Sequence, residues 1–306
     1  MITRYASNGK LLLTGEYLVL LGAKVLAMPV RYKQWMNIFN LKGQSAPVIE
    51  WVAQNEGKVW FEAVFDKSSL SIKATNDEAK ALYLKKILLE IRKLNNDFLK
   101  QDHSYKITTN TDFPVTWGLG TSSTLIANLA KSSGISPFEL YFRVSNGSGY
   151  DLACALSDMP LIYNRNQNDP VFEEIPFYPS FYRSIYFVNR STKQNSAESV
   201  DKFLRNVSVS KSDINKMNGL TDRFIRSENL TEFEEVIYEH EDFLSKKLKI
   251  KPLNKYFNDF PSAMKSLGAW GGDFMMVTWR NDYKYMKEYF VNKGLNVVIP
   301  FSDMIL

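Results

Sequence analysis

The sequence predicts a two-domain α+β protein. Its 306 residues suffice for two domains of ordinary size. Aromatic and β-branched runs between residues 33 and 65 predict strands, whereas residues 77–99 carry apolar side chains at helical spacing. The C-terminal half again mixes both patterns, as in an α+β sandwich. Turn formers and prolines gather between residues 165 and 180, so we expect domains 1–170 and 171–306.

The N-terminal half is predicted to begin with an antiparallel meander. Its expected strands cover residues 33–41, 47–54 and 58–65. The last two are separated by Asn55-Glu56-Gly57, which is typical of a hairpin turn. Residues 77–99 should form an amphipathic helix that covers one face of the sheet, and 105–111 a further strand.

The remaining elements are predicted from caps and periodicity. Ser136 followed by Pro137 predicts a helix start, and Asp151 opens another helix after a glycine turn. The expected C-terminal elements are a strand at 184–191, helices at 196–206, 210–227 and 231–248, and a strand pair at 274–279 and 296–301 around a helix at 283–294. These strands and helices together are typical of an α+β sandwich.

Composition indicates a globular protein with a mixed charged surface. The net charge is +5, and lysines are interspersed with acidic residues rather than clustered. We therefore expect no nucleic-acid partner, although a negatively charged small substrate is compatible with the excess of positive charge. No apolar run reaches membrane-spanning length, so we expect no membrane association. With Cys154 as the single cysteine, these features favour the cytoplasm.

The segment Gly118-Leu119-Gly120-Thr121-Ser122-Ser123 lies between an expected strand and an apolar helical pattern. Glycines let a ligand approach the backbone, and a helix N-terminus attracts phosphate. The spacing matches neither the Walker loop nor the dinucleotide fingerprint. Taken alone, the segment therefore favours an ordinary capped helix over a phosphate site.

Three other segments carry charged residues beside glycines. Lys10 precedes the turn at Gly15-Glu16, Asp151 follows a flexible turn, and Asp273 follows Gly271 and Gly272. Each has an ordinary structural explanation, respectively a solvated charge, a helix cap and a hairpin corner. Their order along the chain is more informative than any of them alone.

That order resembles the GHMP kinases, the superfamily of galactokinase, homoserine kinase, mevalonate kinase and phosphomevalonate kinase. Residues 8–17 are similar to the first motif, 114–123 to the second, 148–151 to the Ser-Gly-x-Asp element, and 268–274 to the glycine-rich third motif. The pentapeptide Gly-Tyr-Asp-Leu-Ala at 149–153 is similar to the bacterial branch named after GYDIA. The resemblance implies an N-terminal nucleotide-binding domain like ribosomal protein S5 and a ferredoxin-like C-terminal domain.

The resemblance also implies the cofactors ATP and Mg²⁺ and roles for particular residues. The backbone of residues 118–123 would hold the ATP phosphates, with Ser122 on the metal. Asp151 would accept the proton of the acceptor hydroxyl, and Lys10 would hold Asp151 and the developing alkoxide. This division is sound, because phosphoryl transfer depends on positioning and charge neutralisation. A second metal contact is expected at Glu139, one residue from the family position, and its alternative is a favourable charge in a first helical turn.

The resemblance also implies residues on the substrate side, some of which depart from the family pattern. They are Glu16, Tyr17, Gly271, Gly272 and Asp273. Tyr17 stands where the family often has histidine, and the third motif is short. These departures leave the acceptor open and keep alternative roles for Asp273, as a metal ligand or a turn cap.

We therefore expect an ATP-dependent kinase that phosphorylates a small-molecule alcohol, with a mevalonate-like acid as the first candidate. Phosphomevalonate and sugars come next. A non-catalytic nucleotide-binding protein and a decarboxylase of the diphosphomevalonate type are the alternatives. Both a monomer and a homodimer are compatible with the sequence.

Overall fold

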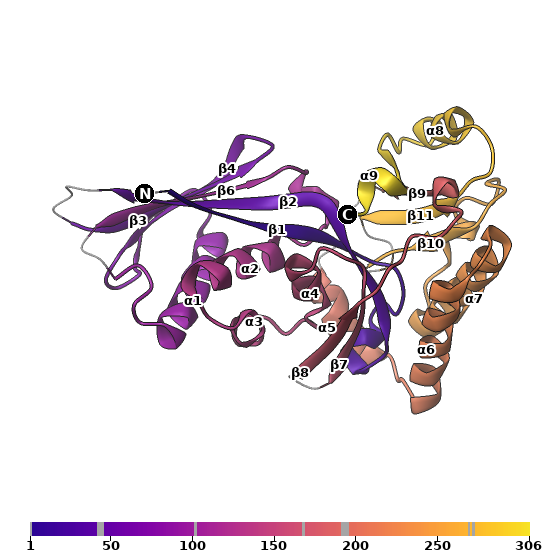
Figure 1. Cartoon of the computed structure of the whole chain (residues 1–306), viewed down its shortest axis with the longest axis horizontal. Helices are drawn as coiled ribbons and strands as arrows, with labels where there is room; N and C mark the ends of the chain where they lie inside the picture. Colours follow the sequence, from indigo (N-terminus) through magenta and orange to yellow (C-terminus); the bar gives the residue numbers. More distant parts are fainter. Residues whose placement is uncertain are drawn as a thin grey trace. The chain divides into compact units, whose positions relative to one another are not determined.

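The computed structural model describes residues 2–41, 46–100, 103–166, 169–190, 196–268, 270 and 273–306. The chain forms two compact units. The first unit comprises residues 1–9, 32–115 and 120–156, and the second comprises 10–31, 116–119 and 157–306. The main division thus falls at 156/157, and two short N-terminal segments belong to the second unit. Strands β1 (Ile2–Leu12) and β2 (Val25–Leu41) contribute to both (Figure 1).

The sheet of the first unit has the strand order β5-β4-β3-β6-β2. The predicted hairpin is confirmed as β3 (Val48–Asn55) and β4 (Lys58–Asp66). The predicted meander is wrong, because β6 (Ser104–Thr111) lies between β2 and β3. It is antiparallel to β2 and parallel to β3. A parallel neighbour requires a long crossover, and the chain supplies one through β5 (Ile72–Thr75) and the following helix.

The helices of the first unit cover one face of this sheet (Figure 1). They are α1 (Glu78–Leu94), α2 (Thr121–Ser133), α3 (Pro137–Val144) and α4 (Tyr150–Leu156). In α1 the predicted apolar stripe is confirmed, since Leu84, Ile87 and Leu88 are buried in the same core as strand residues. The helix is capped by Asp77 and ends five residues before the predicted end.

The second unit contains two groups of strands. The start of β2 pairs with β7 (Leu161–Asn166), which pairs with β8 (Asp169–Glu174). The other group is an antiparallel sheet in the order β10-β11-β9-β12. Its bounds are Met264–Ser266, Phe274–Thr278, Ile185–Asn189 and Val298–Pro300. Strand β10 was not among the predicted elements.

The helices of the second unit confirm the predicted α+β layering. They are α5 (Ser196–Asn206), α6 (Lys211–Arg226), α7 (Leu230–Leu248), α8 (Tyr283–Asn292) and the short α9 (Phe301–Met304). Met286 and Phe290 of α8 share a core cluster with Met275 and Val277 of β11. Helix α7 lies on the opposite face of this sheet (Figure 1). Within the described ranges, no helix is long and apolar enough to cross a membrane.

Buried Asn128 joins α2 to two strands of the first unit. Its Oδ1 accepts from the Ser7 hydroxyl on β1 at 2.9 Å, and its Nδ2 donates to the Gln34 carbonyl on β2 at 3.0 Å. The side chain is fully buried, so removing it leaves these two partners without a replacement from water.

We expect Asn128→Ala to lower the free energy of unfolding by about 2 kcal/mol, because buried polar groups lose their partner. Urea denaturation followed by circular dichroism measures this change. The matched control is Ser132→Ala on the same helix, whose hydroxyl bonds only to the carbonyl of Leu129 among the hydrogen bonds resolved for it. Equal stability of the two variants would contradict the bridging role of Asn128.

Candidate active site

Lys10 contacts the predicted phosphate loop within the second unit. Its Nζ donates to the carbonyl of Gly118 at 2.7 Å, and its backbone N–H donates to the carbonyl of Leu119 at 3.0 Å. The first and second motifs are therefore joined by two hydrogen bonds, although 108 residues separate Lys10 from Gly118. A lysine held in this way presents its charge beside the loop backbone.

The third motif reaches the same loop through Asp273. A Cβ atom built on Gly118 would lie 1.6 Å from Asp273 Oδ2, so the two residues are in close contact. The backbone of Asp273 is fixed, because its carbonyl accepts from Asn189 Nδ2 at 2.9 Å and from the N–H of Arg190 at 2.8 Å. With φ at +66°, Gly118 also adopts a left-handed conformation that favours glycine. Lys10, Gly118 and Asp273 thus lie together in the second unit.

Helix α2 begins in the first unit directly after the loop. Gly120 precedes it with φ of 90°, and the N–H of Thr124 donates to the carbonyl of Gly120 at 3.0 Å. The N–H groups of residues 121–123 therefore stand ahead of the helical ladder. The Ser123 hydroxyl is buried and donates to the Gly120 carbonyl at 2.8 Å, whereas Ser122 is exposed. Of the two serines, Ser122 is therefore the one exposed to a ligand.

Asp151 lies in the first turn of α4 and is held by a tyrosine. Its Oδ1 accepts from the Tyr141 hydroxyl at 3.0 Å and from the N–H of Leu152 at 3.0 Å. Tyr83 of α1 lies near the same carboxylate, and its hydroxyl is hydrogen-bonded with Ser122. Burial, followed by the charge of Asp151, raises the pKa of Tyr83. The structure therefore brings Asp151 and Ser122 to one tyrosine within the first unit.

Tyr141 and Tyr83 were missed by the sequence analysis. Both read as apolar helix residues, because a buried tyrosine has the spacing of a core residue. Burial, and then the negative charge of Asp151, raises the pKa of Tyr141 well above its ordinary value. Tyr141 is therefore a neutral donor to Asp151. Gly147 permits this arrangement, since a Cβ there would lie 2.2 Å from the Tyr141 hydroxyl.

Glu139 lies in the first turn of α3, at a distance of one helical turn from Arg143. Its Oε1 accepts from Arg143 Nη2 at 2.9 Å, and its side chain is 48% exposed. Ser136 caps the same helix. Metal ligation by Glu139 stays a prediction, and it would compete with the Arg143 pair.

Glu16 and Tyr17 lie in the turn that follows β1, in the second unit. The Glu16 carboxylate is fully buried and accepts from Lys265 Nζ at 2.5 Å. Tyr17 is a non-glycine residue with φ of 62°, and its ring contacts Phe203 with a centroid distance of 5.0 Å. Gly271 and Gly272 lie outside the described residues.

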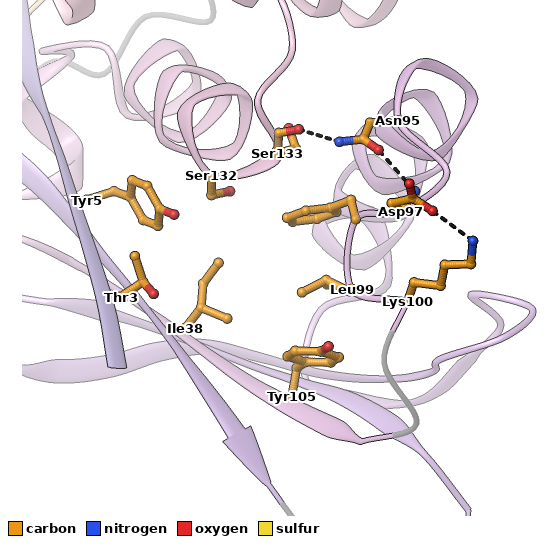
Figure 2. Close-up of a pocket in the computed structure, with 11 residues that line it drawn as sticks. Thr3, Tyr5, Ile38, Asn95, Asp97, Leu99, Lys100, Tyr105, Ser132 and Ser133 are labelled. Atoms are coloured by element: carbon orange, nitrogen blue, oxygen red, sulfur yellow. Dashed lines mark hydrogen bonds and ion pairs between the residues drawn. The ribbon is translucent and has the colours of Figure 1, made fainter. Parts of the chain in front are cut away.

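A separate hollow of about 340 Å³ lies in the first unit and contains none of the predicted site residues. Figure 2 shows it between strand residues such as Tyr5 and Tyr105 and the segment after α1. Its polar rim is bonded internally, since Asn95 donates to the Ser133 carbonyl and Lys100 pairs with Asp97. The rim therefore offers few polar groups to a ligand.

The residues at the loop fit a phosphate-bearing cofactor. In the second unit, left-handed Gly118 opens the backbone and Lys10 supplies a positive charge. In the first unit, left-handed Gly120 precedes α2, and the amides of 121–123 stand ahead of the helical ladder. No group of three or more histidine, cysteine or acidic residues capable of holding a metal occurs among the described residues. Any Mg²⁺ would therefore depend on phosphate oxygens and one or two side chains, as is usual for this ion.

No protein-family model matches the sequence, and no curated protein is significantly similar to it. Solved structures are similar in fold. The Streptococcus pneumoniae phosphomevalonate kinase in complex with phosphomevalonate and AMPPNP aligns with a TM-score of 0.70 at 15% identity, over 97% of this chain and 99% of that one. The Methanococcus jannaschii mevalonate kinase aligns with 0.67 at 14% identity, over 96% and 95%. The Enterococcus faecalis mevalonate diphosphate decarboxylase aligns with 0.59 at 10% identity, over 97% and 96%.

These similarities show that the chain has the GHMP kinase fold along nearly its whole length. The two-domain fold that the resemblance implied is confirmed. At such low identity, the neighbours establish the fold, and the activity has to be argued from the residues of this chain.

Gly118→Ala is expected to destabilise the protein by about 2 kcal/mol more than Gly134→Ala. Both glycines have φ of +66°, but a Cβ at Gly134 meets nothing within 4 Å, whereas one at Gly118 collides with Asp273. The pair separates close contact from backbone strain. Urea denaturation measures the free energy of unfolding of both variants. An equal decrease in the two would show that displacing Asp273 has no energetic cost.

Proposed function

We propose that the protein is an ATP- and Mg²⁺-dependent kinase that transfers a phosphoryl group to the hydroxyl of a small molecule. The observation that carries this proposal is the setting of Asp151. Its carboxylate accepts from buried Tyr141, and Tyr83 lies near it while hydrogen-bonded with Ser122 at the start of α2. The carboxylate is thus connected to a helix N-terminus that can hold phosphate. In a chain with the GHMP kinase fold, this arrangement suits phosphoryl transfer.

In this proposal Asp151 is the base. Its carboxylate, held through Oδ1 by the Tyr141 hydroxyl and the N–H of Leu152, would accept the proton of the acceptor hydroxyl. Tyr141 orients the carboxylate and remains a neutral donor because burial and Asp151 raise its pKa. Lys10 supplies positive charge beside the loop and neutralises charge that develops during transfer.

The cofactor assignment follows from the loop. The backbone of residues 118–123 would hold the ATP phosphates, with the exposed Ser122 hydroxyl as one Mg²⁺ ligand. When bound, the ion neutralises phosphate charge. Glu139 is the proposed second ligand, in competition with Arg143.

The proposed acceptor is a mevalonate-like acid, followed by phosphomevalonate and sugars. Solved neighbours are described as mevalonate and phosphomevalonate kinases, and one is a complex with phosphomevalonate. The net charge of +5 is compatible with an acidic acceptor. Tyr17 and Asp273 are proposed to contact the acceptor. Glu16 precedes Tyr17 in the same turn, and Gly271 and Gly272 would complete the third motif.

The decisive experiment is a coupled assay of ADP release with mevalonate, phosphomevalonate, homoserine and a panel of sugars. We expect turnover with one acid acceptor that requires Mg²⁺ and yields a phosphorylated product by mass spectrometry. Background rates with the whole panel, together with nucleotide binding insensitive to Mg²⁺, would favour the non-catalytic alternative. Release of carbon dioxide from a diphosphorylated acid would favour the decarboxylase.

Asp151→Asn is expected to lower kcat by at least about a hundredfold, because the amide cannot accept the hydroxyl proton. Tyr141 retains an oxygen acceptor in this variant, so the fold should be kept, which circular dichroism can check. The control is Asp158→Asn, at an exposed position just beyond α4. A kcat within twofold of the native value for Asp151→Asn would rule out the base role.

A further inference from the structure

A buried charged cluster in the second unit surrounds the turn Gly15-Glu16-Tyr17. Lys265 of β10 and the neighbouring helix residue His240 of α7 are both fully buried. Lys265 Nζ lies 2.5 Å from Glu16 Oε1 and donates to the carbonyl of Ser266 at 3.0 Å. None of these contacts involves the predicted phosphate loop.

One ring nitrogen of the His240 imidazole lies close to two groups of the turn. Its Nε2 lies 3.2 Å from the backbone nitrogen of Gly15, which can only donate, and 3.3 Å from Glu16 Oε2. A single ring nitrogen cannot accept from Gly15 and donate to Glu16 at the same time. The other nitrogen, Nδ1, has no hydrogen-bond partner among the described residues, so no further contact fixes the tautomer.

The two possible arrangements differ by one proton on the cluster. With Glu16 ionised, Nε2–H donates to Oε2 and the Gly15 N–H loses its acceptor. When Glu16 takes up a proton from solvent, the ring proton moves from Nε2 to Nδ1, and Nε2 accepts from the turn. An ionised carboxylate opposite the lone pair of Nε2 is repulsive, which couples the tautomer to the charge of Glu16.

The groups around Glu16 favour titration in the neutral range. Burial raises the pKa of Glu16 to about 7, against the opposing effect of Lys265. Glu241 of α7 also faces the cluster, accepts from the N–H of Ser266 at 2.8 Å, and has a pKa raised by burial. Burial and Lys265 lower the pKa of His240 well below its usual value, so the ring stays neutral. Arg190 interacts electrostatically with Glu241.

The turn that this cluster holds is strained. Tyr17 has φ of 62°, in the left-handed region that disfavours side chains. Such a conformation persists only when its surroundings impose it. Here the two preceding residues are held in place. The buried Glu16 carboxylate pairs with Lys265, and the backbone N–H of Gly15 lies against His240 Nε2.

We propose that Lys265 and His240 are positioning residues for Tyr17, and that the uptake of one proton by Glu16 determines, through the tautomer of His240, which hydrogen bond holds the turn. The kinetic consequence rests on the proposed function, because Tyr17 is assigned there to the acceptor. The proton arrangement itself does not depend on it.

Nitrogen NMR of the native protein labelled with ¹⁵N-histidine tests the arrangement directly. The chain has only two histidines, so His103→Gln assigns the signals. We expect His240 to be the Nδ1–H tautomer at pH 5.5 and the Nε2–H tautomer at pH 8.5, with a midpoint near 7, where Glu16 titrates. A single tautomer throughout this range, or a protonated ring, would overturn the proposal.

Two variants test the charge partners. Lys265→Met removes the cation that favours ionised Glu16, so the tautomer midpoint should rise by at least about one pH unit. Glu16→Gln should abolish the pH dependence. If Lys265→Met does not fold, Lys265→Met combined with Glu16→Gln removes both buried charges and should recover a folded protein. An unchanged midpoint in Lys265→Met, or a double variant less stable than the single one, would contradict the pairing.

Stability provides an independent readout with a defined sign. Because the folded pKa of Glu16 lies above its ordinary value of 4.5, its contribution is complete below pH 4.5 and is lost as the pH rises through 7. The pKa of His240 is lowered, so its contribution to stability has the opposite pH dependence and is lost as the pH falls below 6.5. The difference in unfolding midpoint between the native protein and Glu16→Gln isolates the first effect, and a difference that does not change between pH 5 and 8 would oppose the proposal.

Steady-state kinetics then test the link to the reaction. Lys265→Met should raise KM for the acceptor about tenfold or more at pH 8 while KM for ATP changes less than twofold, since Tyr17 lies on the acceptor side. Equal changes in both constants would refute the positioning of Tyr17. Absence of any turnover in the native protein would refute the proposed kinase activity, while the NMR result would still decide the proton arrangement.

Discussion

The close contact at Gly118 is the constraint on which the candidate site depends. Its left-handed backbone leaves no room for a side chain because Asp273 lies against it. Its carbonyl accepts from Lys10, and the next carbonyl accepts the backbone N–H of the same lysine. One glycine therefore joins three segments that are far apart in sequence. Substituting it would disturb the lysine, the loop and the third motif together.

Two charged groups that the proposed reaction would use are supported in different ways. Lys10 is held by backbone carbonyls, whereas Asp151 is held by a tyrosine that burial keeps protonated. A neutral donor restrains the carboxylate without adding a positive charge that would lower its pKa and weaken it as a base. The buried Glu16–Lys265 pair supports a third part, the turn after β1. Removing one partner of such a pair is strongly destabilising, because it leaves the other charge buried and unpaired.

Local patterns predicted most of the helices, because an amphipathic stripe and a capping residue are sufficient to specify one. The strand order could not be predicted in the same way. Parallel pairing of β3 with β6 depends on contacts across some 50 residues, and hairpin chemistry suggested a simple meander instead. The motifs predicted Lys10, the loop and Asp151. Tyr141, His240 and Lys265 were missed, because a lone buried tyrosine, histidine or lysine has no sequence pattern that separates it from a core or surface residue.

The central claim is that the loop at 118–123 holds ATP for transfer to an alcohol. A crystal structure of the protein with Mg²⁺ and AMPPNP tests it most directly. We expect nucleotide phosphates on the amides of this loop, the metal on the Ser122 hydroxyl, and Lys10 and Asp151 within hydrogen-bonding reach of the γ-phosphate or of a bound acceptor hydroxyl. Nucleotide bound elsewhere, or a bound γ-phosphate that neither Lys10 nor Asp151 can reach, would contradict it.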